Sequence, residues 1–190
     1  MNTSKPVRTT PPTPSVAGAT SATSAAAGAA TTVVGIADLA VVVGPRARIV
    51  TYALGSCIGL TAYDPIAKVG GMLHFMLAQP AAGSDDAERK PWMFGSSGVP
   101  DLIRRVIELG GSRGRLVFCA AGAAEVIQDC GTFAIGQRNR TILRKLFWKE
   151  NLAIAAEDTG GNAARNLTLD LATGSVSVRM KGEERQLWPK

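Results

Sequence analysis

The sequence predicts a single α/β domain, a layered sandwich of mixed and antiparallel strands with two main helices. The chain has 190 residues, 46% of them hydrophobic, which suits one domain with a sizeable core. Short strand-like segments occur both before and after two segments of helical periodicity. The connections at both ends have hairpin length, so this class is favoured over a doubly wound parallel sheet.

Composition divides the chain into three parts. Residues 1–32 are dominated by Ala, Thr, Ser, Pro and Gly and cannot bury enough apolar surface to offset their ordering entropy. We expect a disordered tail there, a folded domain over residues 33–181 and a short C-terminal tail over residues 182–190. No apolar run reaches the length of about 18 residues that a membrane span needs, and no secretory signal is evident. These features predict a cytoplasmic protein without membrane insertion.

The first half of the domain reads as successive short strands. Its apolar segments are residues 36–43, 47–54, 57–63 and 69–77. Gly-Pro, Gly-Ser and Asp-Pro pairs separate them, which predicts turns between strands. This arrangement would bring Cys57 and His74 onto neighbouring elements. Residues 79–89 are small and charged, which is typical of a loop.

The second half contains the two helices. Apolar residues recur at helical spacing from Ser97 to a stop at Gly110-Gly111, and again over residues 136–151. Residues 116–119 read as a buried strand between them. Alternating apolar and polar residues on both sides of residues 172–174 predict a hairpin with one buried face.

The chain contains one histidine, His74, so a cysteine nucleophile has only one imidazole to activate it. Cys57 follows a Gly-Ser break where the backbone can turn sharply, and the N–H groups of Ser56 and Cys57 there can hold an oxyanion. Cys57 and His74 are therefore the candidate nucleophile and base. The alternative interpretation is a strand cysteine and a core histidine.

A third polar group is needed to orient the imidazole. The nearby candidates are Asp38, Asp64, Thr51, Ser56 and Thr61. The pattern alone does not choose among them. Cys119 and Cys130 have no further histidine to serve them, so we interpret both as structural. Three cysteines without CxxC spacing argue against a disulfide framework and a structural zinc site.

A formal net charge of +6 permits an acidic protein, an anionic membrane surface or a nucleic acid as partner. The second helix carries five basic side chains against one acid, Glu150. They are Arg138, Arg140, Arg144, Lys145 and Lys149. This face is either simply solvated or attracts an acidic partner. Nucleic-acid binding is disfavoured, because aromatics are 5% of the chain and are not interleaved with the basic clusters.

Five fragments stand in order along residues 34–178. They are Thr51-Tyr-Ala-Leu-Gly-Ser-Cys57, Tyr63-Asp-Pro65, Gly70-Gly-Met-Leu-His-Phe-Met-Leu77, Ile135-Gly-Gln-Arg-Asn139 and Ala156-Glu-Asp-Thr-Gly-Gly161. In order and spacing they resemble the CheD chemoreceptor glutamine deamidases. The resemblance implies an α/β sandwich with a Cys-His-Thr triad, which maps onto Cys57, His74 and Thr51, and it implies no metal or organic cofactor.

The resemblance further implies a protein-glutamine glutaminase that converts glutamines of chemoreceptor cytoplasmic helices to glutamate through a cysteine thioester. Methylesterase activity on receptor glutamates would follow the same tetrahedral route, and a generic cysteine protease is a weaker third interpretation. An alternative of another class is a non-catalytic adaptor that binds a CheC-type phosphatase or the receptors. An activated Cys57 would react with iodoacetamide well below a pH of about 8.5, where a free thiol reacts.

Two stretches depart from the pattern of that family. Leu73 stands where the family often has Asn, and Cys119-Ala-Ala-Gly-Ala123 replaces a Phe-Gly-Gly-Ala stretch. Loops beside a site usually decide substrate fit and partner docking, so the departures bear on those two properties.

Overall fold

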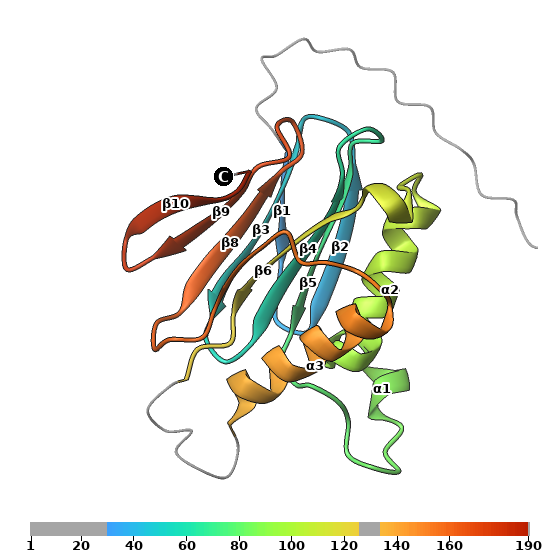
Figure 1. Ribbon diagram of the computed structural model, residues 1–190, viewed down its shortest axis with the longest axis vertical. Coiled ribbons are helices and arrows are strands. Elements are labelled where there is room, and N and C mark those ends of the chain that lie inside the picture. Colours follow the sequence, from blue (N-terminus) through green and yellow to red (C-terminus); the bar gives the residue numbers. More distant parts are fainter. Residues whose placement is uncertain (1–29, 126–133, 190) are drawn as a thin grey trace, which may run out of the picture.

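The computed structural model describes residues 30–125 and 134–189, whose strands form two five-stranded sheets. Sheet A has the order β1-β3-β8-β9-β10, and sheet B has the order β2-β5-β4-β6-β7. Figure 1 shows sheet A, sheet B and the helices as three successive layers, with α2 and α3 over the outer face of sheet B. The expected layered α/β sandwich is confirmed.

The element bounds follow the expected order. Sheet A contains β1 (Ala30–Val34), β3 (Ala47–Leu54), β8 (Arg165–Asp170), β9 (Val176–Met180) and β10 (Glu183–Trp188). Sheet B contains β2 (Asp38–Val43), β4 (Ile58–Asp64), β5 (Val69–Phe75), β6 (Val117–Gly122) and β7 (Ala156–Thr159). The helices are α1 (Asp86–Arg89), α2 (Gly95–Glu108) and α3 (Ile135–Lys149).

Sheet B is covered on both faces, which makes it the centre of the molecule. β4 and β5 are buried along their whole length, as strands between two layers should be. Alternate side chains of β4 point to different cores: Leu60 packs against the helices, whereas Tyr63 packs between the sheets. The strands that carry chemistry therefore have one face toward α2 and α3 and one face toward sheet A.

The folded region extends beyond the expected domain limits at both ends. β1 begins at Ala30, before the expected boundary at residue 33, because Ala30 pairs with Ala47 in a parallel ladder with β3. β10 lies within residues 182–190, the segment expected as a short C-terminal tail. β10 pairs with β9 and buries Leu187 while its other side chains stay largely exposed. Residues 1–29 and Cys130 lie outside the described residues.

Within the two described ranges, no helix combines the length and the apolar character that crossing a membrane requires.

Candidate active site

The turn that carries Cys57 begins at a bulge in β3. The β3–β8 register shifts between Thr51 and Leu54, and Ala53 adopts a positive φ of 56°. The Asn166 side chain holds the bulge by accepting a hydrogen bond from the Ala53 N–H at 3.0 Å. A bulge re-aims the residues that follow it, so the chain leaves sheet A here and turns into β4 with Cys57 at the corner.

The end of β6 holds this turn in place. Ala123 N–H donates to the Cys57 carbonyl at 2.7 Å, and Ala124 N–H donates to the Gly55 carbonyl at 2.7 Å. Gly122 has a φ of 112°, and a Cβ there would lie 2.2 Å from the Cys57 carbonyl oxygen. Only glycine fits that approach. The backbone of Cys57 is therefore fixed by three residues from the neighbouring strand end.

His74 lies on β5 and points between the sheets. Its side chain is buried, with 1% of the residue exposed, and its Nδ1 is 2.8 Å from the Thr51 hydroxyl. That hydroxyl also lies 2.8 Å from the Val34 carbonyl, to which it donates. A hydroxyl has one hydrogen, so Thr51 accepts from an Nδ1–H of the ring. This leaves the His74 Nε2 with a lone pair, as a general base requires.

Cys57 and His74 share one face of sheet B. His74 is directly opposite Gly59 on β4, and Cys57 precedes Gly59 by two residues and packs against the core between the sheets. His74 Nε2 is buried and has no hydrogen-bond partner among the described residues, Cys57 Sγ included. Catalytic contacts are often loose before substrate binds. The unpartnered nitrogen and the sulfur thus lie at the same end of the same layer.

Gly59 provides the room in which Thr51 reaches the histidine. A Cβ at this position would lie 2.8 Å from Leu54 Cδ1 and 3.3 Å from Thr51 Cγ2. At these distances the ends of the Leu54 and Thr51 side chains would have to move. The glycine therefore leaves room for the Thr51 side chain that contacts the ring.

Burial determines the charge state of both groups. Burial lowers the pKa of His74 to about 4, and the Asp38 carboxylate on the adjacent strand partly opposes this. Burial also raises the pKa of the Cys57 thiol, which its own backbone N–H partly opposes. The resting pair at neutral pH is therefore a thiol beside a neutral imidazole. Both charged forms are disfavoured before substrate binds, because each would have to be desolvated.

The turn also offers hydrogen-bond donors. In the described part of the chain, the Ser56 and Cys57 N–H groups donate to no backbone carbonyl, although the carbonyls of this turn are engaged. Such donors beside a nucleophile suit a developing oxyanion.

The other orienting candidates have different partners. Asp64 accepts from Arg115 and from the Ser112 N–H, which together lower the pKa of its carboxyl well below the usual range despite burial. Thr61 exchanges hydrogen bonds with the Cys119 backbone. Asp38 accepts from two nearby backbone N–H groups. Thr51 is the candidate that contacts the imidazole ring.

Comparison with known proteins identifies a family and several similar proteins. The family described as CheD chemotactic sensory transduction matches residues 76–180. A protein of Solibacter usitatus named "probable chemoreceptor glutamine deamidase CheD" is 40% identical over 157 residues, 83% of this chain and 93% of the relative. The chain belongs to the CheD family. A protein of Syntrophus aciditrophicus, "probable chemoreceptor glutamine deamidase CheD 1", is 41% identical over 150 residues, 79% of this chain and 94% of its own.

Sequence reasoning missed one residue of this CheD site, Asn139 on α3. Its side chain is fully buried, and its Nδ2 donates to the Ser56 carbonyl at 3.0 Å and to the Met76 carbonyl at 2.7 Å. One side chain therefore ties the residue before Cys57 to the segment just after His74. The available signal was an amide at helical spacing from Leu143 and Phe147, on the buried face of α3.

The two departures from the CheD pattern have different positions. Leu73 points into the core under the helices, away from the His74 side chain, so it does not line the site. The Cys119–Ala123 stretch does reach the site, since its end holds the Cys57 turn. Cys119 itself is buried, and burial raises the pKa of its thiol to about 11, which fits a structural role.

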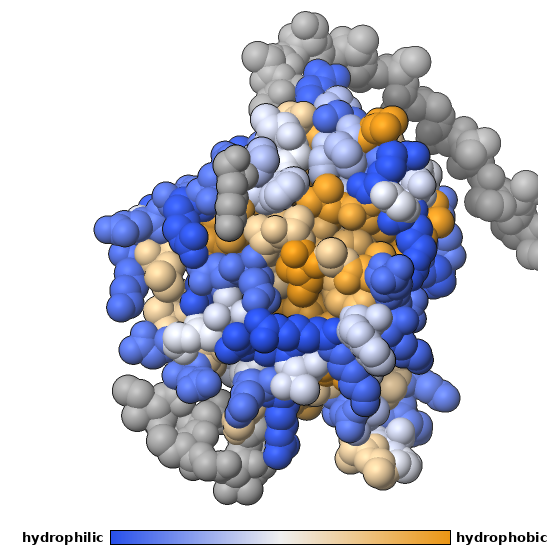
Figure 2. All heavy atoms as spheres, in the orientation of Figure 1, coloured by the Kyte–Doolittle hydropathy of each residue, from blue (hydrophilic) through white to orange (hydrophobic). Residues whose placement is uncertain are grey.

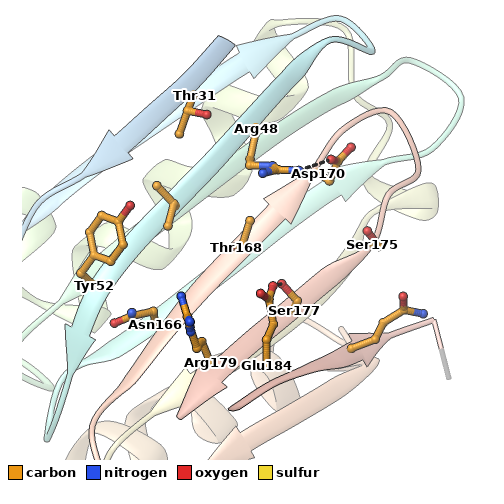
Figure 3. Close-up of a pocket in the computed structure, with 12 residues that line it drawn as sticks. Thr31, Arg48, Tyr52, Asn166, Thr168, Asp170, Ser175, Ser177, Arg179 and Glu184 are labelled. Atoms are coloured by element: carbon orange, nitrogen blue, oxygen red, sulfur yellow. Dashed lines mark hydrogen bonds and ion pairs between the residues drawn. The ribbon is translucent and has the colours of Figure 1, made fainter. Parts of the chain in front are cut away.

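A hollow on the outer face of sheet A is separate from this site (Figure 3). Arg48, Tyr52 and Asp170 line it, with an ion pair between Arg48 and Asp170 at 3.2 Å. Tyr52 follows Thr51 directly and faces the opposite side of β3. The hollow therefore has no access to His74.

Proposed function

We propose that this CheD family member is a protein-glutamine deamidase that converts receptor glutamine side chains to glutamate through a thioester on Cys57. The observation that carries the proposal is the chain of hydrogen bonds from the Val34 carbonyl through Thr51 to His74. It presents an unpartnered Nε2 on the face of sheet B that Cys57 shares. The names of the relatives support the chemoreceptor as substrate, and action on the cytoplasmic helices of a receptor would be a cytoplasmic activity.

The first half-reaction forms the thioester. His74 Nε2 removes the thiol proton as Cys57 Sγ attacks the carbonyl carbon of the glutamine carboxamide. The N–H groups of Ser56 and Cys57 stabilise the resulting oxyanion. The C–N bond then breaks, and the imidazolium returns the proton to the departing nitrogen, which leaves as ammonia. The neutral resting pair fits this sequence, because base and nucleophile exchange one proton only when the substrate is in place.

The second half-reaction hydrolyses the thioester. His74 Nε2 deprotonates a water molecule, which attacks the thioester carbon. The C–S bond breaks, the imidazolium reprotonates the Cys57 sulfur, and glutamate is released. Thr51 keeps the same ring orientation through both steps by accepting from Nδ1–H.

A hydroxyl braces the imidazolium less strongly than a carboxylate would, since it supplies a hydrogen bond without a full charge. Asp38 lies opposite His74 on β2 and favours the protonated ring through its charge. We expect slow turnover from this combination.

The test is mass spectrometry of a purified receptor fragment after incubation with the protein. Amide-to-acid conversion should occur with the wild type and disappear in Cys57→Ala and in His74→Ala. Conversion that persists in either variant would refute the mechanism. Release of methanol from methylated receptor would reveal methylesterase activity by the same groups.

The second candidate is an adaptor that binds a CheC-type phosphatase or receptors without chemistry. Burial raises the pKa of the Cys57 thiol, and a protonated resting thiol is equally compatible with a role without chemistry. An adaptor would bind receptor fragment or phosphatase with unchanged affinity in Cys57→Ala and would convert no glutamine even in the wild type.

A further inference from the structure

A groove with a volume of about 710 Å³ lies between α3 and the segment that follows β5. Figure 1 places both walls at the same end of the molecule, where α3 crosses above the segment between β5 and α1. Half-buried apolar side chains line its inner part: Leu77, Ile135 and Ile142. The opposite wall presents small residues, including Ala81 and Ala82, which allow another backbone to approach closely.

The groove adjoins the nucleophile through Asn139. This residue lines the groove, and its Nδ2 donates to the carbonyl of Ser56, the residue before Cys57. Its Oδ1 is buried and has no partner among the described residues. The buried Asn139 side chain therefore connects the groove to the Cys57 turn.

The groove offers side chains rather than a free strand edge. The N–H groups of Met76 and Leu77 already donate to the Met93 carbonyl. The carbonyls of Leu77 and Ala78 accept from N–H groups at the start of α2. An extended peptide would find these backbone groups occupied. An amphipathic helix needs only an apolar groove with suitable flanking charges.

The charge of the groove selects an acidic occupant. Arg138 and Lys145 line it, and of the described residues that line it none is acidic. Lys145 is exposed and makes no ion pair within the described ranges. Figure 2 shows strongly hydrophilic side chains gathered along the outward face of α3. Opposite charges speed encounter and fix the register of a docked helix.

We propose that this groove docks an acidic amphipathic helix of the chemoreceptor substrate, with its apolar side on Leu77 and Ile142 and a carboxylate on Lys145. This proposal rests on the proposed function and adds the surface that presents the target glutamine to Cys57. It also distinguishes Lys145 from the other basic residues of α3, of which Arg144 forms an ion pair with Glu157 at 2.6 Å.

The test compares two charge reversals on α3, Lys145→Glu and Lys149→Glu. Both lysines are exposed, and both substitutions change the net charge by the same amount, but only Lys145 lines the groove. For deamidation of a receptor fragment, Lys145→Glu should raise KM by about tenfold with kcat nearly unchanged, since a docking charge acts on binding. Lys149→Glu should stay within about twofold. Equal KM changes in the two variants would overturn the proposal.

A second pair tests the shape of the groove. Ala81→Trp would fill it, whereas Ala153→Trp places the same side chain at an exposed position outside it. Only the first should weaken receptor binding, and equal effects would contradict the docking model. If the wild type converts no glutamine, the proposed function fails. Titration of labelled receptor fragment into Cys57→Ala, with and without Lys145→Glu, then still decides whether the groove binds it.

Discussion

Replacing Thr51 by valine keeps the shape of the side chain and removes the hydroxyl that braces His74. Thr51 is fully buried, so the change leaves the Val34 carbonyl and the His74 Nδ1–H without their partners. Each buried polar group left unsatisfied costs about 1–3 kcal/mol, so the loss of both partners should lower stability by about 2–6 kcal/mol. The ring also loses the contact that fixes its tautomer. General-base catalysis contributes about 10²–10⁴-fold, so kcat should fall by about 10² or more.

Thr61→Val is the matched control. Thr61 is also fully buried, two residues along β4 from Gly59, and its hydroxyl bonds both the N–H and the carbonyl of Cys119 at 3.2 Å. This variant should lose a similar amount of stability and keep kcat within about threefold, because Cys119 takes no part in the chemistry. Thr51→Ser retains the hydroxyl and should recover much of the activity that Thr51→Val loses.

The assay combines urea unfolding with ammonia release from a receptor fragment. Ammonia release is measured under conditions in which more than nine-tenths of every variant is folded, which requires a free energy of unfolding of about 1.4 kcal/mol. If Thr51→Val and Thr61→Val reduce kcat by the same factor under those conditions, the hydroxyl of Thr51 serves the fold alone. The bracing role of Thr51 would then be refuted.

Three further results are expected. The pKa of His74 is about 4 in the folded protein and 6.5 ordinarily, so between these pH values the unfolded chain binds more protons than the folded one. The free energy of unfolding should therefore fall by up to about 3 kcal/mol as the pH drops from 6.5 to 4. Urea unfolding of His74→Gln should lack this component, and an unchanged pH dependence would contradict it. Gly122→Ala would place a Cβ 2.2 Å from the Cys57 carbonyl oxygen, so deamidation should fall by about 10² or more, and full activity would show that the turn tolerates movement. Asn139→Leu removes two hydrogen bonds to the catalytic segments. It should lower kcat by about tenfold or more with KM nearly constant, whereas a change in KM alone would point to a role in docking.

Alternation and turn chemistry were sufficient to predict β3 of sheet A and the β4–β5 pair of sheet B. The apolar segments before and after residues 55–57 became β3 and β4, and the segment from Val69 became β5. Two successive strands joined by a short turn form antiparallel neighbours, as β4 and β5 do, whereas β3 belongs to the other sheet. That is why the Cys57 turn and His74 could be expected on adjacent elements, and β4 and β5 are indeed paired with Gly59 opposite His74.

The strands at the two ends of the domain were not predictable from the same pattern. β10 exposes four consecutive polar residues, Glu183 to Gln186, and places only Leu187 in the core. An edge strand on a sheet with one open face is stabilised mainly by its backbone hydrogen bonds to the neighbouring strand. Its sequence therefore need not alternate between apolar and polar residues. β1 likewise buries little besides Val34. Yet Val34 supplies the carbonyl that orients the Thr51 hydroxyl, so a part of the site came from a segment assigned mostly to the tail.

The role of Asn139 follows from where the strands end. Beyond its last ladder bond a strand leaves carbonyls without partners, and a buried carbonyl must find a donor. The turn after β3 and the end of β5 leave two such carbonyls, those of Ser56 and Met76, close together under α3. A side-chain amide with two N–H donors satisfies both, and an apolar residue at the same helical position would leave both unpaired. The Asn139 side chain that satisfies both carbonyls therefore also holds the Cys57 turn against the end of β5. Replacing Asn139 by an apolar residue should therefore lower kcat and also destabilise the fold, because both carbonyls lose their donor.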